Sequence, residues 1–474
     1  MNRRGFIKKT AGSGIAIGTM PTILTGSSWK GASDRVRVAQ IGIHGFGQHH
    51  IGQYQALDNV EVAALCDVDA NLFPGVIKNH FTDKGLTAPK TYQDLRKLVE
   101  DPEIDAVSIT TPNHWHTPAA LWAIGAGKHV SVEKPCCHTF YEGQKLVEAA
   151  GKHDVIVQDG AEQRSNPCGI SMAEYLSSGK MGEVYLAKGI CYKRRDSIGT
   201  YPDGPMQPGE KFAFTVNSTD YEPPYTRSYL ANVDYDLWQG SAPALPFNPN
   251  RFHYNWHWNW IYGNGDMGNQ GVHEMDIARW GLGVALPTRI TASGAKVMFD
   301  DMQNTPNVLM TMFEFPDPAG WEGKKRILQF EVRHWDHNPE GALTGVDEGG
   351  NTYMTSRTNT VGNLFLGSEG YMSKNVNRWQ VFNGPEREPG DSGSGIGNHF
   401  RDFVDAIRAG DQSLARGDIR EGFYSCALIH LGNISYRLGR SLDFDPEKMK
   451  FVNDPEADAM LTKEYRKGFE LPAV

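Results

Sequence analysis

The chain has few cysteines for its length, and none of them stands in a metal-binding spacing. The six are Cys66, Cys136, Cys137, Cys168, Cys191 and Cys426. No two of them form a Cys-x-x-Cys pair, so the spacing of zinc ribbons and of disulfide-rich scaffolds is missing. We therefore expect no metal site. We expect mostly free, buried thiols, because cysteine is among the most buried residue types.

The sequence also lacks a long hydrophobic run and an excess of basic residues. No stretch beyond residue 32 approaches the roughly eighteen apolar residues of a transmembrane helix, so we expect no membrane span in the mature protein. The net charge is −9. Residues 1–31 carry five of the lysines and arginines and no acidic residue, and the net charge without them is about −14. An acidic surface argues against nucleic acid and anionic membranes as partners.

The N-terminus has the order of an export signal. Arg3-Arg4-Gly5-Phe6-Ile7-Lys8 comes first, and a mild apolar stretch rich in Gly, Ala, Ile and Thr follows up to Leu24. Residues 1–32 resemble a twin-arginine signal, which is recognised by this order of basic, apolar and small residues. The resemblance implies export of a folded protein to the periplasm. The signal is then either cleaved near residues 28–32 or kept as an anchor.

Strand and helix signals alternate between residues 36 and 158. Strand-like runs cover 36–43, 60–66, 104–110, 129–132 and 155–158, with helical patterns between them. This order predicts an α/β fold with a parallel, doubly wound sheet, whose ligand lies at the carboxyl ends of the strands.

The pattern changes near residue 160. Runs at 184–191, 289–297, 308–315 and 326–331 alternate like antiparallel strands, and 399–408 and 421–438 have helical patterns. Stretches 196–255 and 376–397 are rich in Gly, Pro and aromatic residues and predict loops. We expect an export segment (1–32), a cofactor-binding domain (33–160), an α+β domain for substrate and oligomer contacts (161–445) and a tail (446–474).

A glycine-rich turn follows the first strand-like run. It reads Gly42-x-x-Gly45-x-Gly47, with His44 and Phe46 inside it. Glycines between a strand and a helix let the backbone approach a dinucleotide pyrophosphate, whose charge the helix N-terminus stabilises. We therefore assign all five residues, Gly42, His44, Gly45, Phe46 and Gly47, to cofactor binding.

Asp67 ends the second strand-like run, twenty-five residues after Gly42. A carboxylate at this point can accept hydrogen bonds from the ribose hydroxyls and would repel a 2′-phosphate, so the pattern favours NAD over NADP. An ordinary turn residue is the alternative for Asp67.

Further polar residues follow the later strands. Thr111, Asn113 and His114 come after the run at 104–110 and could contact the ribose or frame the nicotinamide, although Thr111 or Asn113 could equally cap a helix. Glu133 and Lys134 follow the run at 129–132. This places a lysine at the sheet edge where the reactive ring of the cofactor should lie.

Four motifs, in this order and spacing, resemble the Gfo/Idh/MocA family, the glucose-fructose oxidoreductase and inositol dehydrogenase group. They are Gly-x-x-Gly-x-Gly, Cys66-Asp67-Val68-Asp69, Thr111-Pro112-Asn113-His114-Trp115-His116 and Glu133-Lys134-Pro135. The resemblance implies a Rossmann domain, a second domain with an open, mainly antiparallel sheet, and NAD(P)-dependent redox chemistry on sugars or polyols. It also implies that Lys134 is the catalytic lysine and that homodimers or homotetramers pair through the open sheet.

The resemblance implies a second catalytic element further along the chain. The family has Asp-x-x-x-His on a helix, and here Asn269 occupies the aspartate position before His273. Spacings of four and three place Asn269, His273 and Asp276 near one helix face. We assign His273 as the acceptor of the substrate hydroxyl proton and Lys134 as the group that stabilises the oxygen. Asparagine cannot support an imidazolium as a carboxylate does, so either Asp266 or Asp276 takes that role or the proton path differs.

Aromatic and polar residues near this element suggest a sugar site. Trp256 and Trp258 alternate with polar side chains and can pack on the C–H faces of a sugar ring, although an aromatic core or a subunit contact is the alternative. Gln163 and Arg164, after the last strand-like run, are further candidates for substrate binding. Tyr192 belongs to a basic cluster that can bind a hydroxyl or carboxylate, or can form a solvated charged face.

These features together predict an exported NAD-dependent oxidoreductase that acts on a CH–OH group of a carbohydrate, glycoside or cyclic polyol. Free NAD is scarce outside the cytoplasm, so we expect a tightly bound cofactor that cycles between its two forms. One alternative is a glycosidase that oxidises transiently, eliminates an aglycone and returns the hydride, although the catalytic histidine motif of that branch is not evident. The other is a non-catalytic sugar-binding protein, which Asn269 favours and which Lys134 and His273 argue against.

Overall fold

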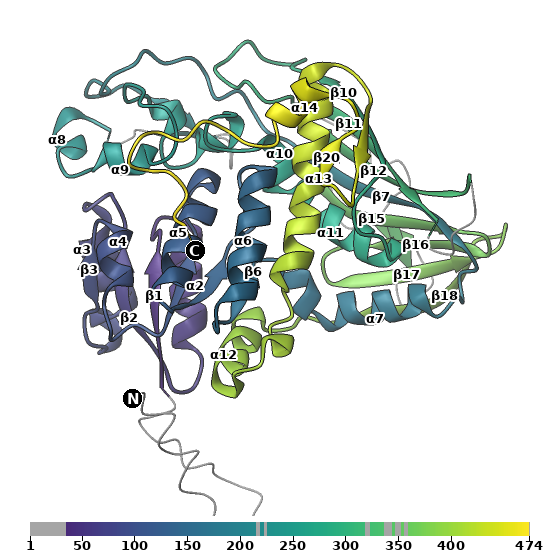
Figure 1. The fold of residues 1–474 in the computed structure, drawn as a ribbon, viewed down its shortest axis with the longest axis horizontal. Coiled ribbons are helices and arrows are strands. Elements are labelled where there is room, and N and C mark those ends of the chain that lie inside the picture. Colours follow the sequence, from purple (N-terminus) through teal and green to yellow (C-terminus); the bar gives the residue numbers. More distant parts are fainter. Residues whose placement is uncertain are drawn as a thin grey trace, which may run out of the picture. The chain divides into compact units, whose positions relative to one another are not determined.

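A six-stranded parallel sheet organises the first part of the described chain (Figure 1). The computed structural model describes residues 35–214, 219–221, 225–317, 323–335, 344–346, 352–354 and 359–473. The sheet order is β3-β2-β1-β4-β5-β6, which confirms the predicted doubly wound Rossmann sheet. Its strands are β1 (Val36–Ile41), β2 (Val60–Cys66), β3 (Lys90–Tyr92), β4 (Ala106–Ile109), β5 (His129–Val132) and β6 (Val157–Asp159). The expected export signal, residues 1–32, lies outside the described residues.

Helices cover both faces of this sheet. One face packs against α2 (Phe46–Gln55), α3 (Leu72–His80) and α12 (His399–Ala409). The other packs against α4 (Leu95–Val99), α5 (Asn113–Gly125) and α6 (Phe140–Lys152). Because both faces are buried, most strands are near-continuous apolar runs and are visible in the sequence. The exception is β3, whose three residues Lys90-Thr91-Tyr92 carry no such pattern.

A ten-stranded sheet organises the rest of the chain, in the order β18-β17-β16-β15-β7-β12-β11-β10-β19-β20. Its described pairings are antiparallel except that of β7 with β12, which confirms a mainly antiparallel sheet. The strands are β7 (Val184–Lys193), β10 (Arg289–Ala295), β11 (Val308–Pro316), β12 (Lys325–Arg333), β15 (Asn359–Gly367), β16 (Gly370–Lys374), β17 (Arg378–Asn383), β18 (Glu388–Ser394), β19 (Leu442–Asp445) and β20 (Lys450–Phe451).

The two stretches expected as loops turn out differently. The expectation for 376–397 is wrong, because β17 and β18 pair there as a hairpin. Trp379 and Val381 are buried in β17, whereas β18 is a polar, glycine-containing edge strand whose composition conceals it. In the described part of 196–255 the elements are short: β8 (Phe212–Phe214), β9 (Thr219–Tyr221), α8 (Arg227–Leu230), α9 (Tyr235–Gln239) and the 3-10 helix η4 (Pro249–Arg251), with η5 (Asn255–Trp258) starting at the end of the stretch. Two more short strands, β13 (Thr344–Val346) and β14 (Thr352–Met354), form a separate pair.

Among the described residues, three long helices pack against the second sheet. They are α7 (Pro167–Ser177), α11 (Gly271–Leu282), which follows the short α10 (Gly265–Asn269), and α13 (Ile419–Leu438). The last of these, α13, also lies along α6, so it joins the two sheets (Figure 1). Among the described residues, no helix has both the length and the apolar character that a bilayer crossing requires.

The C-terminal segment returns to the first sheet after α14 (Pro455–Ala459). The N–H of Tyr141 in α6 donates to the carbonyl oxygen of Leu461 at 2.9 Å. The ring of Phe469 packs edge-on against Trp115 of α5. From Val36 onward the chain forms one compact unit, and the domain boundaries expected at residues 160 and 445 stay predictions.

Candidate functional site

Four parallel strands end at one cavity of about 720 Å³. The residues that directly follow β1, β2, β4 and β5 all line it, and they are Gly42, Asp67, Thr110 and Glu133. The cavity continues past Lys134 to Asn269 and His273, where α10 meets α11. One cavity therefore connects the glycine turn with the predicted catalytic pair.

Close backbone contacts shape the glycine turn. A Cβ on Gly47 would lie 2.0 Å from the carbonyl oxygen of Gly42, and a Cβ on Gly42 would lie 2.9 Å from the backbone of Thr110. Gly42 and Gly45 have φ angles of 83° and 55°, which favour glycine. The helix α2 begins directly after the turn and has no acidic residue in its first turn. Its N-terminal N–H groups and positive dipole end therefore suit a pyrophosphate.

Asp67 presents its carboxylate at this end of the cavity. Its Oδ2 accepts a hydrogen bond from the N–H of Ile43 at 2.9 Å, and its Oδ1 accepts one from the N–H of Asp69 at 3.0 Å. Burial raises the pKa of Asp67, and the two N–H bonds oppose that rise. These bonds fix the side chain at the end of β2, where dinucleotide-binding sheets place the ribose.

His44 of the glycine turn stacks on His253 from the later part of the chain, with ring centroids 4.4 Å apart. His253 has a positive φ of 56°, and its Nε2 lies 2.8 Å from Oδ2 of Asp69. The hydroxyl of Tyr229 also donates to Asp69. Burial and the neighbouring His253 lower the pKa of His44 to about 4, so the His44 ring is neutral near pH 7.

Residues 225–262, which we name the crossing segment, form another wall of the cavity. Its lining residues are Leu237, Trp238, His253, Tyr254, Trp256 and His257. At the end of β2, the N–H of Asp234 donates to the carbonyl oxygen of Val68 at 2.9 Å. At the start of α5, Nε1 of Trp115 donates to the carbonyl oxygen of Trp238 at 2.9 Å. The crossing segment is therefore anchored to the first sheet at two strand ends.

Lys134 reaches the cavity from the loop after β5. Its Nζ donates to the carbonyl oxygen of Asn269 at 2.7 Å, and its backbone N–H donates to Oε2 of Glu133 at 3.1 Å. The other oxygen of Glu133 lies 3.2 Å from Nε2 of His50. Burial alone would raise the pKa of Glu133, but the hydrogen bond with His50 and the charge of Lys134 bring it down to about 2. An anionic Glu133 therefore accompanies the lysine.

His273 lines the same cavity from the first turn of α11. Its Nδ1 lies 3.4 Å from Oε2 of Glu162, which belongs to the short 3-10 helix η3 (Glu162–Ser165). Burial lowers the pKa of His273, and the Glu162 carboxylate opposes that effect. The carboxylate in direct contact with the histidine is thus Glu162. Of the two expected candidates, Asp276 borders a small cavity together with His273 and Lys134.

Asn269 belongs to a buried charge network. Its Nδ2 donates to Oδ1 of Asp266 at 3.2 Å. The guanidinium of Arg195 donates to the same carboxylate at 2.7 and 2.9 Å, and Nε2 of His334 lies 2.7 Å from it. Burial would raise the pKa of Asp266, but Arg195 and His334 hold it well below its usual value. An aspartate at position 269 would put a second carboxylate against this anion, whereas the amide donates to it.

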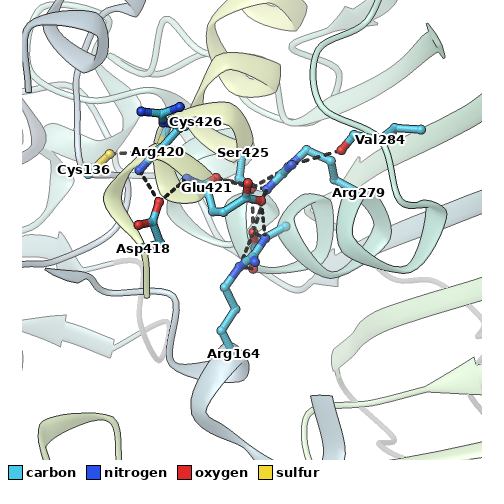
Figure 2. A network of polar contacts seen from close by, with 10 residues as sticks. Cys136, Arg164, Arg279, Val284, Asp418, Arg420, Glu421, Ser425 and Cys426 are labelled. Atoms are coloured by element: carbon cyan, nitrogen blue, oxygen red, sulfur yellow. Dashed lines mark hydrogen bonds and ion pairs between the residues drawn. The ribbon is translucent and has the colours of Figure 1, made fainter. Parts of the chain in front are cut away.

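Arg164 and Asp276 bind each other and do not line the large cavity. The guanidinium donates to both carboxylate oxygens at 2.7 to 3.0 Å, and both side chains are buried. Ser425 donates to Asp276 at 2.6 Å. Figure 2 shows Arg164, Arg279 and Ser425 converging on this point. The pair links η3, α11 and α13, and loss of one partner would leave the other charge buried and unpaired. The roles expected for Arg164 and Asp276 stay predictions.

Three other predicted substrate or cofactor residues also have buried protein partners. Nε2 of His114 bonds the carbonyl oxygen of Trp238 at 2.9 Å, and burial lowers the pKa of this histidine to about 3. The hydroxyl of Tyr192 donates to Glu331 at 2.8 Å. The Arg195 guanidinium lies 4.6 Å from the ring of Trp258. Neither these residues nor Gln163, which accepts a hydrogen bond from Lys374, line the large cavity.

The remaining predicted residues gather at the cavity. Those that line it are Gly42, His44, Gly45, Phe46, Asp67, Thr111, Asn113, Glu133, Lys134, Trp256, Asn269 and His273, with Gly47 packed behind Gly42. Further lining residues include Glu162, to which no sequence motif points, and His253, Tyr254 and His257, which belong to the same aromatic run as Trp256.

A doubly wound sheet with a glycine turn at its ligand edge defines a dinucleotide-binding α/β protein. A family model described as an oxidoreductase family with an NAD-binding Rossmann fold matches residues 36–161. A second, described as the C-terminal alpha/beta domain of the oxidoreductase family, matches residues 212–319 and 395–471. Together they cover more than half of the sequence, and the chain belongs to the Gfo/Idh/MocA oxidoreductase family.

Two kinds of curated relative share part of the chain. A glycosyl hydrolase family 109 protein of Shewanella pealeana is 34% identical over 170 residues, which are 32% of this chain and 37% of that protein. An inositol 2-dehydrogenase of Salmonella typhimurium is 29% identical over 154 residues, 32% of this chain and 44% of that enzyme. The matches therefore span less than half of the length of these relatives.

Solved structures share the fold over most of the chain. Levoglucosan dehydrogenase in complex with NADH superposes with a TM-score of 0.60 and 17% identity, covering 86% of this chain and 99% of that one. An aldose-aldose oxidoreductase from Caulobacter crescentus, complexed with glycerol, gives a TM-score of 0.58 and 15% identity, covering 86% and 100%. At these identities the likeness establishes the fold.

Proposed function

We propose that this protein transfers hydride between NAD and a CH–OH carbon of a carbohydrate, glycoside or cyclic polyol. The observation that carries the proposal is that Lys134 and His273 line the same cavity as the glycine turn and Asp67. The names of an inositol 2-dehydrogenase relative and of levoglucosan dehydrogenase structures that contain NADH and levoglucosan support the same substrate class.

The residues present fit a dinucleotide. Gly42 and Gly47 leave a backbone surface that a single Cβ would obstruct, and α2 points its N-terminus there. Among the described residues, none bonds the buried Oγ1 of Thr111, which lines the cavity and can serve a polar ligand group. The carboxylate of Asp67 would accept bonds from ribose hydroxyls and repel a 2′-phosphate, which supports NAD over NADP.

His273 and Lys134 have different roles at the substrate hydroxyl group: His273 accepts its proton and Lys134 binds its oxygen. NAD, when bound, supplies the hydride acceptor for oxidation. His273 takes the hydroxyl proton while the C–H hydride leaves and the C=O bond forms. Because Nδ1 of this histidine faces Glu162, Nε2 is the nitrogen that receives the proton. The Lys134 ammonium, held by the carbonyl of Asn269, donates to the substrate oxygen and stabilises the negative charge that develops there.

The crossing segment supports a cofactor that stays bound between turnovers. Its backbone is bonded to the chain after β2 and to α5, and its side chains line the cavity together with Asp67 and the glycine turn. Release of a dinucleotide would then require these contacts to open. Retention suits a protein exported with its cofactor, and the basic and apolar order of residues 1–32 supports the twin-arginine route to the periplasm.

The first test is purification of the chain without added nucleotide, followed by mass spectrometry of the released ligand and NADH absorbance with a panel of sugars, glycosides and inositols. We expect NAD to co-purify and to be reduced by one substrate class. Lys134→Met and His273→Asn should each lower kcat by about 10²- to 10⁴-fold, while His153→Asn, at the far end of α6, should not. Absence of nucleotide, with no reduction after NAD is added, would contradict the proposal.

Glycoside cleavage by transient oxidation is a second candidate, because the glycosyl hydrolase family 109 relative shares 34% identity over its matched part. In that reaction oxidation acidifies the neighbouring C–H, the aglycone leaves by elimination, water adds and the hydride returns. Aglycone release without net NADH, and exchange of the neighbouring C–H with solvent deuterium, would support it. Accumulation of NADH in proportion to an oxidised sugar would support the dehydrogenase instead.

A further inference from the structure

Sulfur and imidazole ligands gather behind the loop that carries Lys134. The Sγ atoms of Cys136, Cys137 and Cys426 all lie within 4.8 Å of one another, and all three residues are fully buried. Nε2 of His430 lies 3.4 Å from Sγ of Cys137, and this histidine is only 5% exposed. We name these four residues the sulfur cluster.

The sulfur cluster joins two elements that are far apart in the sequence. Cys136 and Cys137 follow Lys134 and its proline neighbour in the loop after β5. Cys426 and His430 are four residues apart on α13, so they project from one face of that helix. Figure 2 shows Cys136 and Cys426 facing each other across the junction.

We propose that the sulfur cluster binds a Zn²⁺ ion through three thiolates and one imidazole. Tetrahedral zinc, with bonds of about 2.3 Å to sulfur and about 2.0 Å to nitrogen, places neighbouring ligand atoms about 3.5–3.8 Å apart. The sulfurs of Cys136 and Cys426 are 3.7 Å apart, and the sulfur of Cys137 lies 3.4 Å from Nε2 of His430. These two separations match edges of a tetrahedral site. The three sulfurs lie within 4.8 Å of one another, so zinc would draw them together, and the His430 imidazole would move with Sγ of Cys137 to complete the site.

A disulfide accounts for less of this arrangement. It would draw the sulfurs of Cys136 and Cys426 together from 3.7 Å to about 2.05 Å, and it would leave the third thiol facing His430. Core packing of protonated thiols gives a weak hydrogen bond between Cys137 and Nε2 of His430 and one between Cys136 and Cys426, but it does not require three thiols and an imidazole to gather at one buried point. Zinc would use the three thiolates together and would recruit the imidazole beside Cys137 as the fourth ligand of a closed structural site.

The spacing explains why the sequence analysis predicts no metal. The donors are an adjacent Cys-Cys pair and a Cys-x-x-x-His pair almost three hundred residues later, and neither resembles a zinc ribbon. None of the four lines the large cavity. The ion would therefore be structural, and it would fix the Lys134 loop to α13, which also carries Ser425 of the Arg164–Asp276 network.

The test measures zinc in the full-length chain, purified without chelators and without a histidine tag. We expect about one zinc per chain by elemental mass spectrometry, and less than about a tenth of that in Cys136→Ser and in Cys426→Ser. Cys168→Ser is the matched control, because Cys168 is equally buried but lies in α7 outside the cluster. This variant should keep its zinc.

Should the cluster variants fail to fold, the wild-type chain still decides the question. Dialysis against a strong zinc chelator should remove the metal and lower the midpoint of thermal unfolding, and added Zn²⁺ should restore it. Co²⁺ in place of zinc should give the visible absorption of tetrahedral, thiolate-bound cobalt. A zinc-free chain whose thiols all react with an alkylating reagent after denaturation overturns the proposal. A Cys136–Cys426 disulfide, detected as a mass lower by two hydrogens, overturns it as well.

Discussion

His273 lies between influences that shift its pKa in opposite directions. Burial lowers the pKa, and the carboxylate of Glu162, 3.4 Å from Nδ1, raises it. Substrate oxidation needs the neutral imidazole, so activity should fall as the pH drops through this pKa. Glu162→Gln removes the raising influence, and we expect the acidic limb of kcat/KM to move to lower pH. The measurement is the pH profile of NADH formation.

A matched control for this experiment is Glu148→Gln, which removes the same charge from the exposed surface of α6. Its profile should coincide with that of the wild type. An acidic limb that stays in place in Glu162→Gln, or that moves to higher pH, would show that this carboxylate does not act on the histidine.

Asn269→Asp should make the protein sensitive to pH. The new carboxyl would face Asp266, which Arg195 and His334 keep ionised, so its folded-state pKa would be raised above the unfolded value. Protonated, it can donate to Asp266 as the amide does. Stability is therefore present at low pH and lost as the pH rises through the raised pKa. We expect the thermal midpoint of the variant to fall below that of the wild type at about pH 8 and to approach it at about pH 5.

Asn398→Asp controls for the chemical change alone. The side chain of Asn398 caps α12 by accepting the N–H of Arg401, and aspartate caps a helix equally well. Its thermal midpoint should follow that of the wild type at both pH values. A constant deficit in Asn269→Asp across this range would argue against repulsion by Asp266.

Residue placement can be predicted from the sequence where one local pattern fixes it. Gly42, Asp67 and Lys134 each follow a strand of a parallel sheet, so the edge they share follows from the fold. Helical spacing predicts Asp276 near His273, and both border one small cavity, but it does not predict the ion pair of Asp276 with Arg164, 112 residues away in sequence. Helical spacing shows which residues share one face of a helix. It does not show which charged residue from elsewhere in the chain packs against that face.

At the scale of elements, alanine substitution of two glycines tests whether the turn before α2 binds NAD. Gly47→Ala would place a Cβ 2.0 Å from the carbonyl oxygen of Gly42, so the turn must move. We expect NAD affinity to fall by at least roughly a hundredfold, because the backbone N–H groups no longer fit the pyrophosphate. Calorimetric titration of the nucleotide-free protein measures this.

Gly52→Ala is the matched control in the same helix, since nothing lies within 4 Å of its Cβ position. Alanine inside a helix is more favourable than glycine by about 0.5–1 kcal/mol. NAD affinity should be unchanged and the thermal midpoint equal or higher. Equal NAD affinity in Gly47→Ala and Gly52→Ala would show that the glycine turn does not take part in cofactor binding.

The crossing segment should control how fast NAD leaves. Asp69 is buried and holds both His253 and Tyr229 of this segment. Asp69→Ala leaves those two polar groups without their acceptor, which costs about 1–3 kcal/mol for a buried group. We expect NAD to dissociate roughly ten- to a hundredfold faster, measured as nucleotide retained after repeated desalting.

Asp83→Ala removes an exposed carboxylate that pairs with Lys78 on the outside of the first sheet, and its NAD retention should match that of the wild type. Equal retention in Asp69→Ala would mean that the crossing segment does not limit release.

Helices and strands can be predicted from the sequence more readily when they are deeply buried. Strands buried on both faces, such as β1 and β4, are continuous apolar runs, and α12 has a clear amphipathic period. The edge strand β18 contains glycine, proline and acidic residues, and its pairing with β17 supplies the order that its own composition does not. Local propensity is weak at edges, where cross-strand neighbours decide the conformation.

For the whole molecule, the change of sequence pattern near residue 160 predicts that there are two sheets. It does not predict the contacts that join them. The sulfur cluster and the crossing segment each join parts of the chain that are more than a hundred residues apart. Such contacts are set by packing of the completed fold. They decide how the Lys134 loop and the cavity walls are held, which composition and periodicity do not reveal.

The second sheet predicts how copies of the chain associate. In β11, Thr311 faces α13, so alternation turns Met310 and Met312 to the other face of the sheet, and they are 48% and 41% exposed. Two large apolar side chains on a sheet face favour burial against a second copy, and we expect a homodimer or homotetramer. Replacing both methionines with lysine should lower the mass measured by light scattering toward that of one chain. Leu86→Lys, at a similarly exposed apolar residue before β3, should leave the mass unchanged. A monomeric wild type, or a double variant of unchanged mass, would refute this interface.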